Sequence, residues 1–197
     1  VDPSDDLDRI FAALASNDAI LEAAVDFESE VSFLLARSAD GLIIHYPASL
    51  NTHKNGILAQ SVAPAEISES LLKDGQRALQ TLAVEMKLTG VLAMETFITE
   101  DGTLLFNEIA PRPHNSFHWT IEGCATSQFA QLARCLAGMP FGSTKSYGQW
   151  KMRNLLGEDM DQLDKLAAKA DLHLHLYGKN TAKNGRKMGH TNRQISR

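Results

Sequence analysis

Cysteine is scarce in this sequence, whose 197 residues include only Cys124 and Cys135. The two lie in a stretch that the apolar pattern predicts to be one helix, where a rise of about 1.5 Å per residue would separate them by about 16 Å. A disulfide needs Cα atoms within about 7 Å of each other, and a zinc site built on thiolates needs more ligands than these. We therefore expect two buried free thiols in a reducing compartment, the cytoplasm.

Long apolar runs and an excess of basic charge are lacking as well. No run approaches the roughly 18 apolar residues that span a bilayer, and no signal peptide opens the chain, so no membrane partner is expected. The formal net charge of −5 argues against nucleic acid, which binds to a basic face. The hydrophobic share of 44% and the charged share of 22% are those of an ordinary globular protein.

The common nucleotide and hydrolase motifs are also missing. We find neither the G-x-G-x-x-G pattern nor a P-loop, and no G-x-S-x-G turn of a serine hydrolase. What the sequence does contain is turn signals between strand-like and helix-like segments. The predicted strands are 19–25, 31–37, 42–46, 91–98, 103–109, 150–156 and 172–177.

Three helices are predicted among these strands. The first begins at Ser4, whose hydroxyl is a suitable cap, the second begins at Pro64, and the third ends near Gly138. Residues 51–56 are expected to be a polar loop. The order is hairpin, helix, hairpin, helix, which predicts an α+β fold with a mostly antiparallel sheet and covering helices. The character of the sequence changes near Gly142, which divides it into residues 1–142 and a small β-rich domain, 143–197, with a basic tail.

The second hairpin brings two carboxylates together. If Asp101-Gly102 forms a two-residue turn, Glu95 stands directly opposite Glu108. The same register pairs Thr96 with Asn107 and Phe97 with Phe106. Opposed like charges destabilise a sheet, whereas a hard divalent cation would turn the pair into a site. The alternative is a longer turn, whose shifted register would send one glutamate to the other face and into water.

Basic and polar groups form two further candidates. Residues 112–118, Arg-Pro-His-Asn-Ser-Phe-His, follow Pro111 and present an arginine, a histidine and an asparagine from a stiff backbone. These side chains could bind an anion such as phosphate; a merely solvated loop is the alternative. A basic tail carries Lys179, Lys183, Arg186, Lys187, His190 and Arg193. It fits a small phosphorylated ligand, nucleic acid or plain solvation equally well by composition. We interpret the remaining histidines as surface residues, namely His45, His173 and His175.

The string Asn-Glu-Ile-Ala-Pro-Arg-Pro-His-Asn-Ser at 107–116, followed by His-Trp-Thr at 118–120, resembles a known family. It is similar to N5-carboxyaminoimidazole ribonucleotide synthetase, an ATP-grasp enzyme of purine biosynthesis. Strings at 30–32, 36–41, 51–58 and 185–190 agree, the last reading Gly-Arg-Lys-Met-Gly-His. The resemblance covers residues 20–192.

This resemblance implies an activity and a set of site residues. The family joins ATP, bicarbonate and 5-aminoimidazole ribonucleotide, through carboxyphosphate, and uses Mg²⁺ or Mn²⁺; it commonly forms homodimers. The resemblance assigns the metal to Glu95 and Glu108. It assigns the nucleotide to Glu22, Val25, Glu30, His53, Asn107 and Glu108. It assigns catalysis to Arg112, His114 and Asn115, and substrate binding to the same three together with Ser116, Lys179, Arg186 and Lys187.

The sequence departs from the family pattern in two respects. Phe117 stands where the family usually has glycine, which would crowd the substrate loop. The family's N-terminal domain and the lid over the ATP phosphates have no counterpart here, nor does its last helix after Asn192. We therefore expect this chain to be a piece of the ligase that is inactive alone. The alternatives are a formate-dependent glycinamide ribonucleotide transformylase, which shares the Pro-Arg-Pro-His string, and an ATP-grasp fragment that binds ligand without catalysis.

Overall fold

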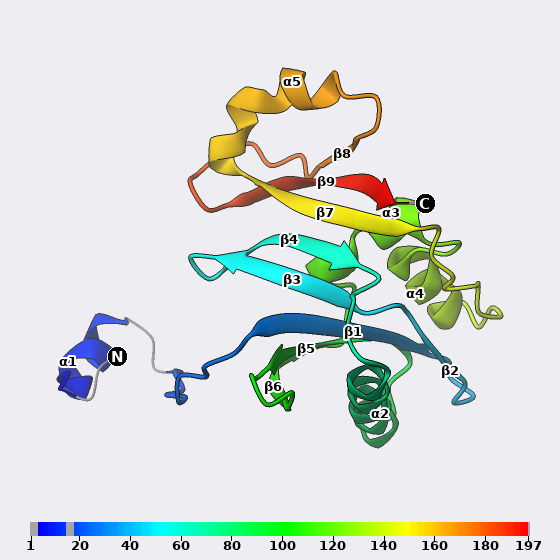
Figure 1. The fold of residues 1–197 in the computed structure, drawn as a ribbon, viewed down its shortest axis with the longest axis horizontal. Coiled ribbons are helices and arrows are strands. Elements are labelled where there is room, and N and C mark those ends of the chain that lie inside the picture. The colour runs from blue at the N-terminus through cyan, green and yellow to red at the C-terminus, as the bar shows by residue number, and fades with distance from the viewer. Residues whose placement is uncertain (1–3, 15–17, 197) are drawn as a thin grey trace.

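A single antiparallel sheet organises the part of the chain that the structure, a computed structural model, describes, residues 4–14 and 18–196 (Figure 1). Its strand order is β6-β5-β1-β3-β4-β7-β9-β8, and β2 pairs with β1. The strands are β1 (Ser29–Arg37), β2 (Ile43–His45), β3 (Ser49–Lys54), β4 (Ile57–Ala63), β5 (Gly90–Ile98), β6 (Leu104–Ala110), β7 (Gln149–Leu156), β8 (His173–Leu176) and β9 (Lys187–Ser196). Neighbouring strands run antiparallel, which confirms the predicted α+β class.

Helices cover both faces of the sheet. Two longer ones, α2 (Glu69–Glu85) and α4 (Gln128–Leu136), pack against β1 and β5. Successive residues of β1 point to opposite faces, so Phe33 joins the core under α2 and Leu34 joins the core on the other face. The shorter helices are α1 (Leu7–Ala13), η1 (Asn115–Phe117), α3 (Thr120–Gly123), η2 (Gly157–Gln162) and α5 (Leu163–Ala167). None of the described helices is long and apolar enough to cross a membrane.

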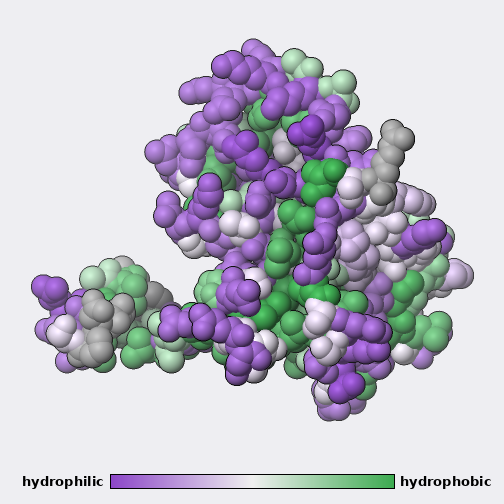
Figure 2. All heavy atoms as spheres, viewed as in Figure 1, coloured by the Kyte–Doolittle hydropathy of each residue, from purple (hydrophilic) through white to green (hydrophobic). Residues whose placement is uncertain are grey.

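The N-terminal predictions need correction. Asp6, not Ser4, caps α1, because its carboxylate accepts a hydrogen bond from the Arg9 N–H at 3.1 Å. Pro3 lies outside the described residues. The strand expected at 19–25 is irregular chain without a pairing partner in the described structure. Its short apolar run stays largely at the surface, as the green N-terminal segment of Figure 2 shows, with Ile20 82% exposed.

The loop expected at 51–56 is a hairpin between β3 and β4. Asn55 and Gly56 form its turn, both with positive φ, at 51° and 71°. Asn-Gly is the pair that a two-residue hairpin turn favours, because asparagine and glycine tolerate this backbone. The prediction took the polar residues as loop and missed that signal. The start of α2 also differs from the prediction. The helix begins at Glu69 and not at Pro64, because Ser68 caps it: the Ser68 Oγ accepts a hydrogen bond from the Leu71 N–H at 3.3 Å.

The two cysteines are free and buried, as predicted, but they do not share a helix. Cys124 follows the end of α3, and Cys135 lies in α4. Ser127 separates the two helices, because its hydroxyl accepts from the Ala130 N–H at 3.2 Å and so starts α4 as a new helix.

The residues after Gly142 extend the same sheet. β7 pairs with β4, with Ser61 opposite Met152, so strand pairing crosses the predicted division of the chain. That division remains a prediction. The basic segment is not a tail, because β9 runs for ten residues between β7 and β8.

Candidate active site

The β5–β6 hairpin places Glu95 directly opposite Glu108, as the sequence predicted, but by another route. The turn is longer by one residue, because the Thr99 N–H donates to Thr103 O at 3.1 Å and Gly102 takes a positive φ of 78°. Thr96 therefore pairs with Phe106, and Phe97 with Leu105, which corrects the predicted register. Asn107 is the extra residue of a β-bulge, and this bulge returns the two glutamates to register.

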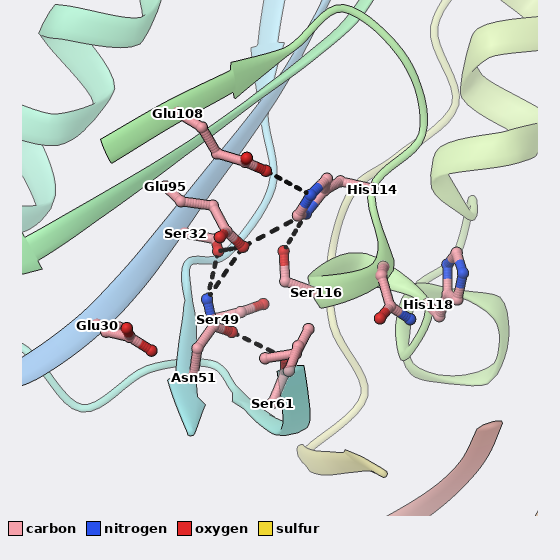
Figure 3. A network of polar contacts seen from close by, with 12 residues as sticks. Glu30, Ser32, Ser49, Asn51, Ser61, Glu95, Glu108, His114, Ser116 and His118 are labelled. Atoms are coloured by element: carbon pink, nitrogen blue, oxygen red, sulfur yellow. Dashed lines mark hydrogen bonds and ion pairs between the residues drawn. The ribbon is translucent and has the colours of Figure 1, made fainter. Parts of the chain in front are cut away.

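His114 completes a three-residue cluster with the two carboxylates (Figure 3). Its Nδ1 lies 3.5 Å from Glu95 Oε1 and its Nε2 lies 3.3 Å from Glu108 Oε1. One ligand atom from each residue lies within 4.8 Å of the others. Glu95 and His114 are buried, whereas the Glu108 side chain is 55% exposed. Two carboxylate oxygens and an imidazole nitrogen at this spacing form a suitable donor set for a divalent cation.

The loop after β6 holds His114 in place. Its backbone is fixed by Gln128, at the start of α4, and Ser116 Oγ lies 2.8 Å from its Nδ1. Burial lowers the pKa of the His114 imidazole, and the neighbouring carboxylates of Glu95 and Glu108 oppose this shift only in part. The imidazole is therefore neutral near pH 7, the form that a metal ligand requires.

A cavity of about 370 Å³ opens beside this cluster. Lys187, from β9, brings a cation to it. Burial lowers the pKa of the Lys187 amine, while Glu95 and Glu108 raise it. The cavity is lined by Glu30, His53, Gly56, Leu58, Glu95, Asn107, Glu108, His114 and Lys187.

A family model described as the ATP-grasp domain matches residues 1–129, well over half of the chain. The chain belongs to the ATP-grasp family. A second model, the phosphoribosylaminoimidazole carboxylase C-terminal domain, matches residues 151–194.

Relatives of this ATP-grasp chain share its sequence over nearly its whole length. It is 44% identical to the N5-carboxyaminoimidazole ribonucleotide synthase of Brucella melitensis, over 93% of this chain and 51% of the relative. The identity to the Bacillus subtilis enzyme of the same name is 41%, over 93% of this chain and 49% of the relative. The chain thus spans about half the length of the relatives it matches.

Solved structures agree with these relatives. The synthetase from Thermus thermophilus superposes with a TM-score of 0.80 at 43% identity, over 88% of this chain and 48% of that one. The enzyme from Aspergillus clavatus, in complex with ADP and 5-aminoimidazole ribonucleotide, gives a TM-score of 0.82 at 29% identity, over 88% of this chain and 48% of that one.

Of the residues that the resemblance assigns, some line this cavity, and Arg112 and Asn115 lie on the segment that follows β6. Glu30 pairs with His53 Nδ1 at the cavity. Asn115 exchanges two hydrogen bonds with Asn154 of β7, at 2.9 and 2.6 Å. Arg112 is exposed, and its guanidinium donates to Pro113 O at 3.1 Å.

Other assigned residues lie elsewhere in the described structure. Arg186 does not line the cavity beside Lys187, and its guanidinium donates to Thr181 O at 3.0 Å within its own loop. Lys179 Nζ donates to Lys187 O at 2.6 Å and does not line the cavity. Glu22 and Val25 belong to the irregular segment before β1, with Glu22 exposed. Their assignments to ligands remain predictions.

Phe117 does not crowd the cavity. Its side chain is fully buried in the core on the α4 side of the sheet, together with Trp119 and Leu34. The residue that departs from the family pattern therefore contributes packing, and from this loop only His114 lines the cavity.

The interpretation of His45, His173 and His175 as surface residues was wrong for His45 and His175. His175 Nε2 lies 2.7 Å from Glu122 Oε1, and its ring stacks on His190 with centroids 4.5 Å apart. His190 is only 2% exposed, and burial lowers its pKa to about 3. His45 is half-buried, and burial lowers its pKa as well. His173 is exposed, as expected.

The prediction also missed the buried polar residues that support the cluster. Ser32, Asn51 and Ser61 lie behind Glu95, and Gln128 lies behind His114. A polar residue inside an apolar strand pattern is the signal that could have revealed Ser32. Asn51 was assigned to a loop, and for Gln128 the helix pattern gives no signal.

Proposed function

We propose that this chain carries the metal-binding and substrate-binding half of an ATP-dependent N5-carboxyaminoimidazole ribonucleotide synthetase. In that reaction ATP transfers its terminal phosphate to bicarbonate, which gives ADP and carboxyphosphate. The amino group of 5-aminoimidazole ribonucleotide then takes up the carboxyl group, and phosphate leaves. The observation that carries the proposal is the facing pair Glu95 and Glu108, which shares one cavity with Lys187. The ATP-grasp family and the names of the relatives support it.

The residues present fit a divalent cation. Glu95 is buried beside another carboxylate, an arrangement that is unfavourable unless a cation compensates it. Glu95, Glu108 and His114 would hold Mg²⁺ or Mn²⁺. When bound, such an ion neutralises negative charge on the phosphates of the nucleotide.

The side chains around the cation site have separate tasks in this proposal. Lys187, which lines the same cavity, attracts an anionic group of the substrate. The Asn115–Asn154 pair ties the substrate loop to β7 and so limits its motion. Catalysis then rests on positioning and charge neutralisation, without a protein nucleophile. A cytoplasmic location, expected from the two free thiols, and a homodimer, implied by the resemblance, remain predictions.

Phosphate release by a chimera tests the activity. In it, the N-terminal half of the Bacillus subtilis relative precedes this chain. We expect phosphate release from ATP, Mg²⁺ and bicarbonate that requires 5-aminoimidazole ribonucleotide, and negligible turnover by the 197 residues alone. The variant Glu95→Gln should abolish release, and Glu100→Gln, on the exposed turn of the same hairpin, should retain it. Stimulation by formate and glycinamide ribonucleotide instead would assign the chain to the transformylase.

A further inference from the structure

A row of buried polar side chains crosses the sheet and ends at Glu95 (Figure 3). The Ser61 hydroxyl donates to Asn51 Oδ1 at 2.8 Å. Asn51 Nδ2 donates to Ser32 Oγ at 2.6 Å and approaches Glu95 Oε1 at 3.4 Å. The Ser32 hydroxyl donates to Glu95 Oε1 at 3.0 Å. All four residues are buried, with Ser32 and Ser61 fully so.

The strand register places these residues next to one another. Ser61 of β4 is opposite Asn51 of β3, and Ser32 of β1 is opposite Glu95 of β5. Between β3 and β1, Asn51 is opposite Glu30, and its amide reaches Ser32 diagonally. Because β4, β3, β1 and β5 are neighbours in the sheet, the backbone ladder fixes the row. Its direction is also fixed. The Ser61 proton holds the Asn51 carbonyl oxygen, which turns the amide N–H groups toward Ser32 and Glu95, and the Ser32 proton then has Glu95 as its acceptor.

Within residues 4–14 and 18–196, the side-chain contacts that reach Glu95 use one oxygen. Ser32, Asn51 and, at 3.5 Å, His114 Nδ1 approach Oε1. Hydrogen bonds to an ionised carboxylate are stronger than those between neutral groups, so the Ser32 hydroxyl and the Asn51 amide hold Oε1 within the protein. The second oxygen, Oε2, is the one that the row leaves for a ligand.

We propose that Asn51 is a positioning residue for the cation site. Through Ser32 and its own amide it commits Glu95 Oε1 to hydrogen bonds within the protein, and so fixes the orientation of the carboxylate that would hold a divalent cation. This inference rests on the proposed function, which makes Glu95 a metal ligand. A small ion such as Mg²⁺ demands near-octahedral geometry, and a carboxylate held at one oxygen meets that demand without reorganisation.

Binding of Mn²⁺ to the 197-residue chain, followed by electron paramagnetic resonance of the free ion, tests the inference. Asn51→Leu removes the amide at similar volume, and we expect it to weaken Mn²⁺ binding about tenfold, as supporting residues of metal ligands commonly do. Ser61→Ala should weaken it less. The double variant should match Asn51→Leu alone, because Ser61 acts only through Asn51, and such non-additivity marks residues of one network.

A matched control separates positioning from stability. Asn192 is also fully buried, and its amide donates to His118 O at 2.9 Å, away from the cation cluster. Asn192→Leu should lower the melting temperature and leave Mn²⁺ affinity unchanged. Ser32→Ala deletes a single oxygen atom, so it keeps the test open if Asn51→Leu fails to fold, and it should weaken Mn²⁺ binding several-fold.

The outcomes distinguish the two proposals. If the wild-type chain binds no Mn²⁺, or binds it equally after Glu95→Gln, the proposed metal site is wrong. If the wild type binds Mn²⁺ through Glu95 but Ser32→Ala and Asn51→Leu bind it equally well, the positioning role of Asn51 is wrong. Strict additivity of Asn51→Leu and Ser61→Ala would also overturn it.

Discussion

The side chain of Gln128 forms two hydrogen bonds with the backbone of His114, one in each direction. Its Oε1 accepts from the His114 N–H at 2.8 Å, and its Nε2 donates to His114 O at 2.8 Å. Gln131, in the next turn of α4, contacts Gly142 in the same way, at 3.0 and 3.1 Å. Both glutamines are fully buried. The two thus bond alike to the backbone of one residue each, and Gln128 Nε2 also lies 3.0 Å from His118 Nδ1. Only Gln128 supports a residue of the cation cluster.

This pair provides a controlled prediction. Gln128→Leu and Gln131→Leu each leave a backbone N–H and a C=O without their partners, which costs about 1–3 kcal/mol per group. Urea unfolding should show similar losses of stability for both. Only Gln128→Leu should weaken Mn²⁺ binding, because the His114 imidazole loses its position. Equal Mn²⁺ affinities in the two variants would show that Gln128 acts through stability alone.

Lys187 and Arg186 provide a second comparison. They are adjacent in sequence, but Lys187 lines the cavity and Arg186 bonds within its own loop. In the chimera, Lys187→Met should raise the KM for 5-aminoimidazole ribonucleotide tenfold or more, since a hydrogen bond to a charged group contributes about 1.5–3 kcal/mol. Arg186→Met should change it less than about threefold. Steady-state kinetics measures both, and equal rises would contradict the placement of Arg186.

The predicted pairing of Glu95 with Glu108 shows how far sequence arithmetic reaches. A period of two and a turn signal give the hairpin and the approximate register. They do not reveal that the turn has one more residue or that Asn107 forms a bulge, because a bulge depends on how β6 meets its partner in three dimensions. The pairing came out right because the bulge offsets the longer turn.

The support of the site depends on contacts between distant segments. Asn51 reaches Glu95 across 44 residues of sequence, and its amide has a role only once β3 and β5 flank β1. Local patterns carry no record of such neighbours. The prediction of a strand at 19–25 was wrong for a related reason. An apolar run becomes a strand only where a partner strand is available, and none of the described strands pairs with this segment.

Buried histidines predict how stability depends on pH. Burial lowers the pKa of His118 to about 4 and that of His190 to about 3; the two rings lie 4.8 Å apart. In the unfolded chain a histidine has a pKa of about 6.5. Below about pH 6.5 these histidines bind protons in the unfolded chain but stay neutral in the folded protein. The free energy of unfolding is therefore constant above about pH 7 and falls as the pH drops from 6.5 toward 4.

The slope of that fall identifies the residues. Each proton taken up only by the unfolded chain contributes about 1.4 kcal/mol per pH unit. Urea unfolding at several pH values between 6.5 and 5 should therefore give a shallower slope for His190→Gln, by about one proton, than for the wild type. The window lies above the range in which most carboxylates titrate, so their contribution is small. A slope that is unchanged in His190→Gln, or a stability that rises as the pH falls, would show that His190 is not held neutral by its burial between β7 and β8.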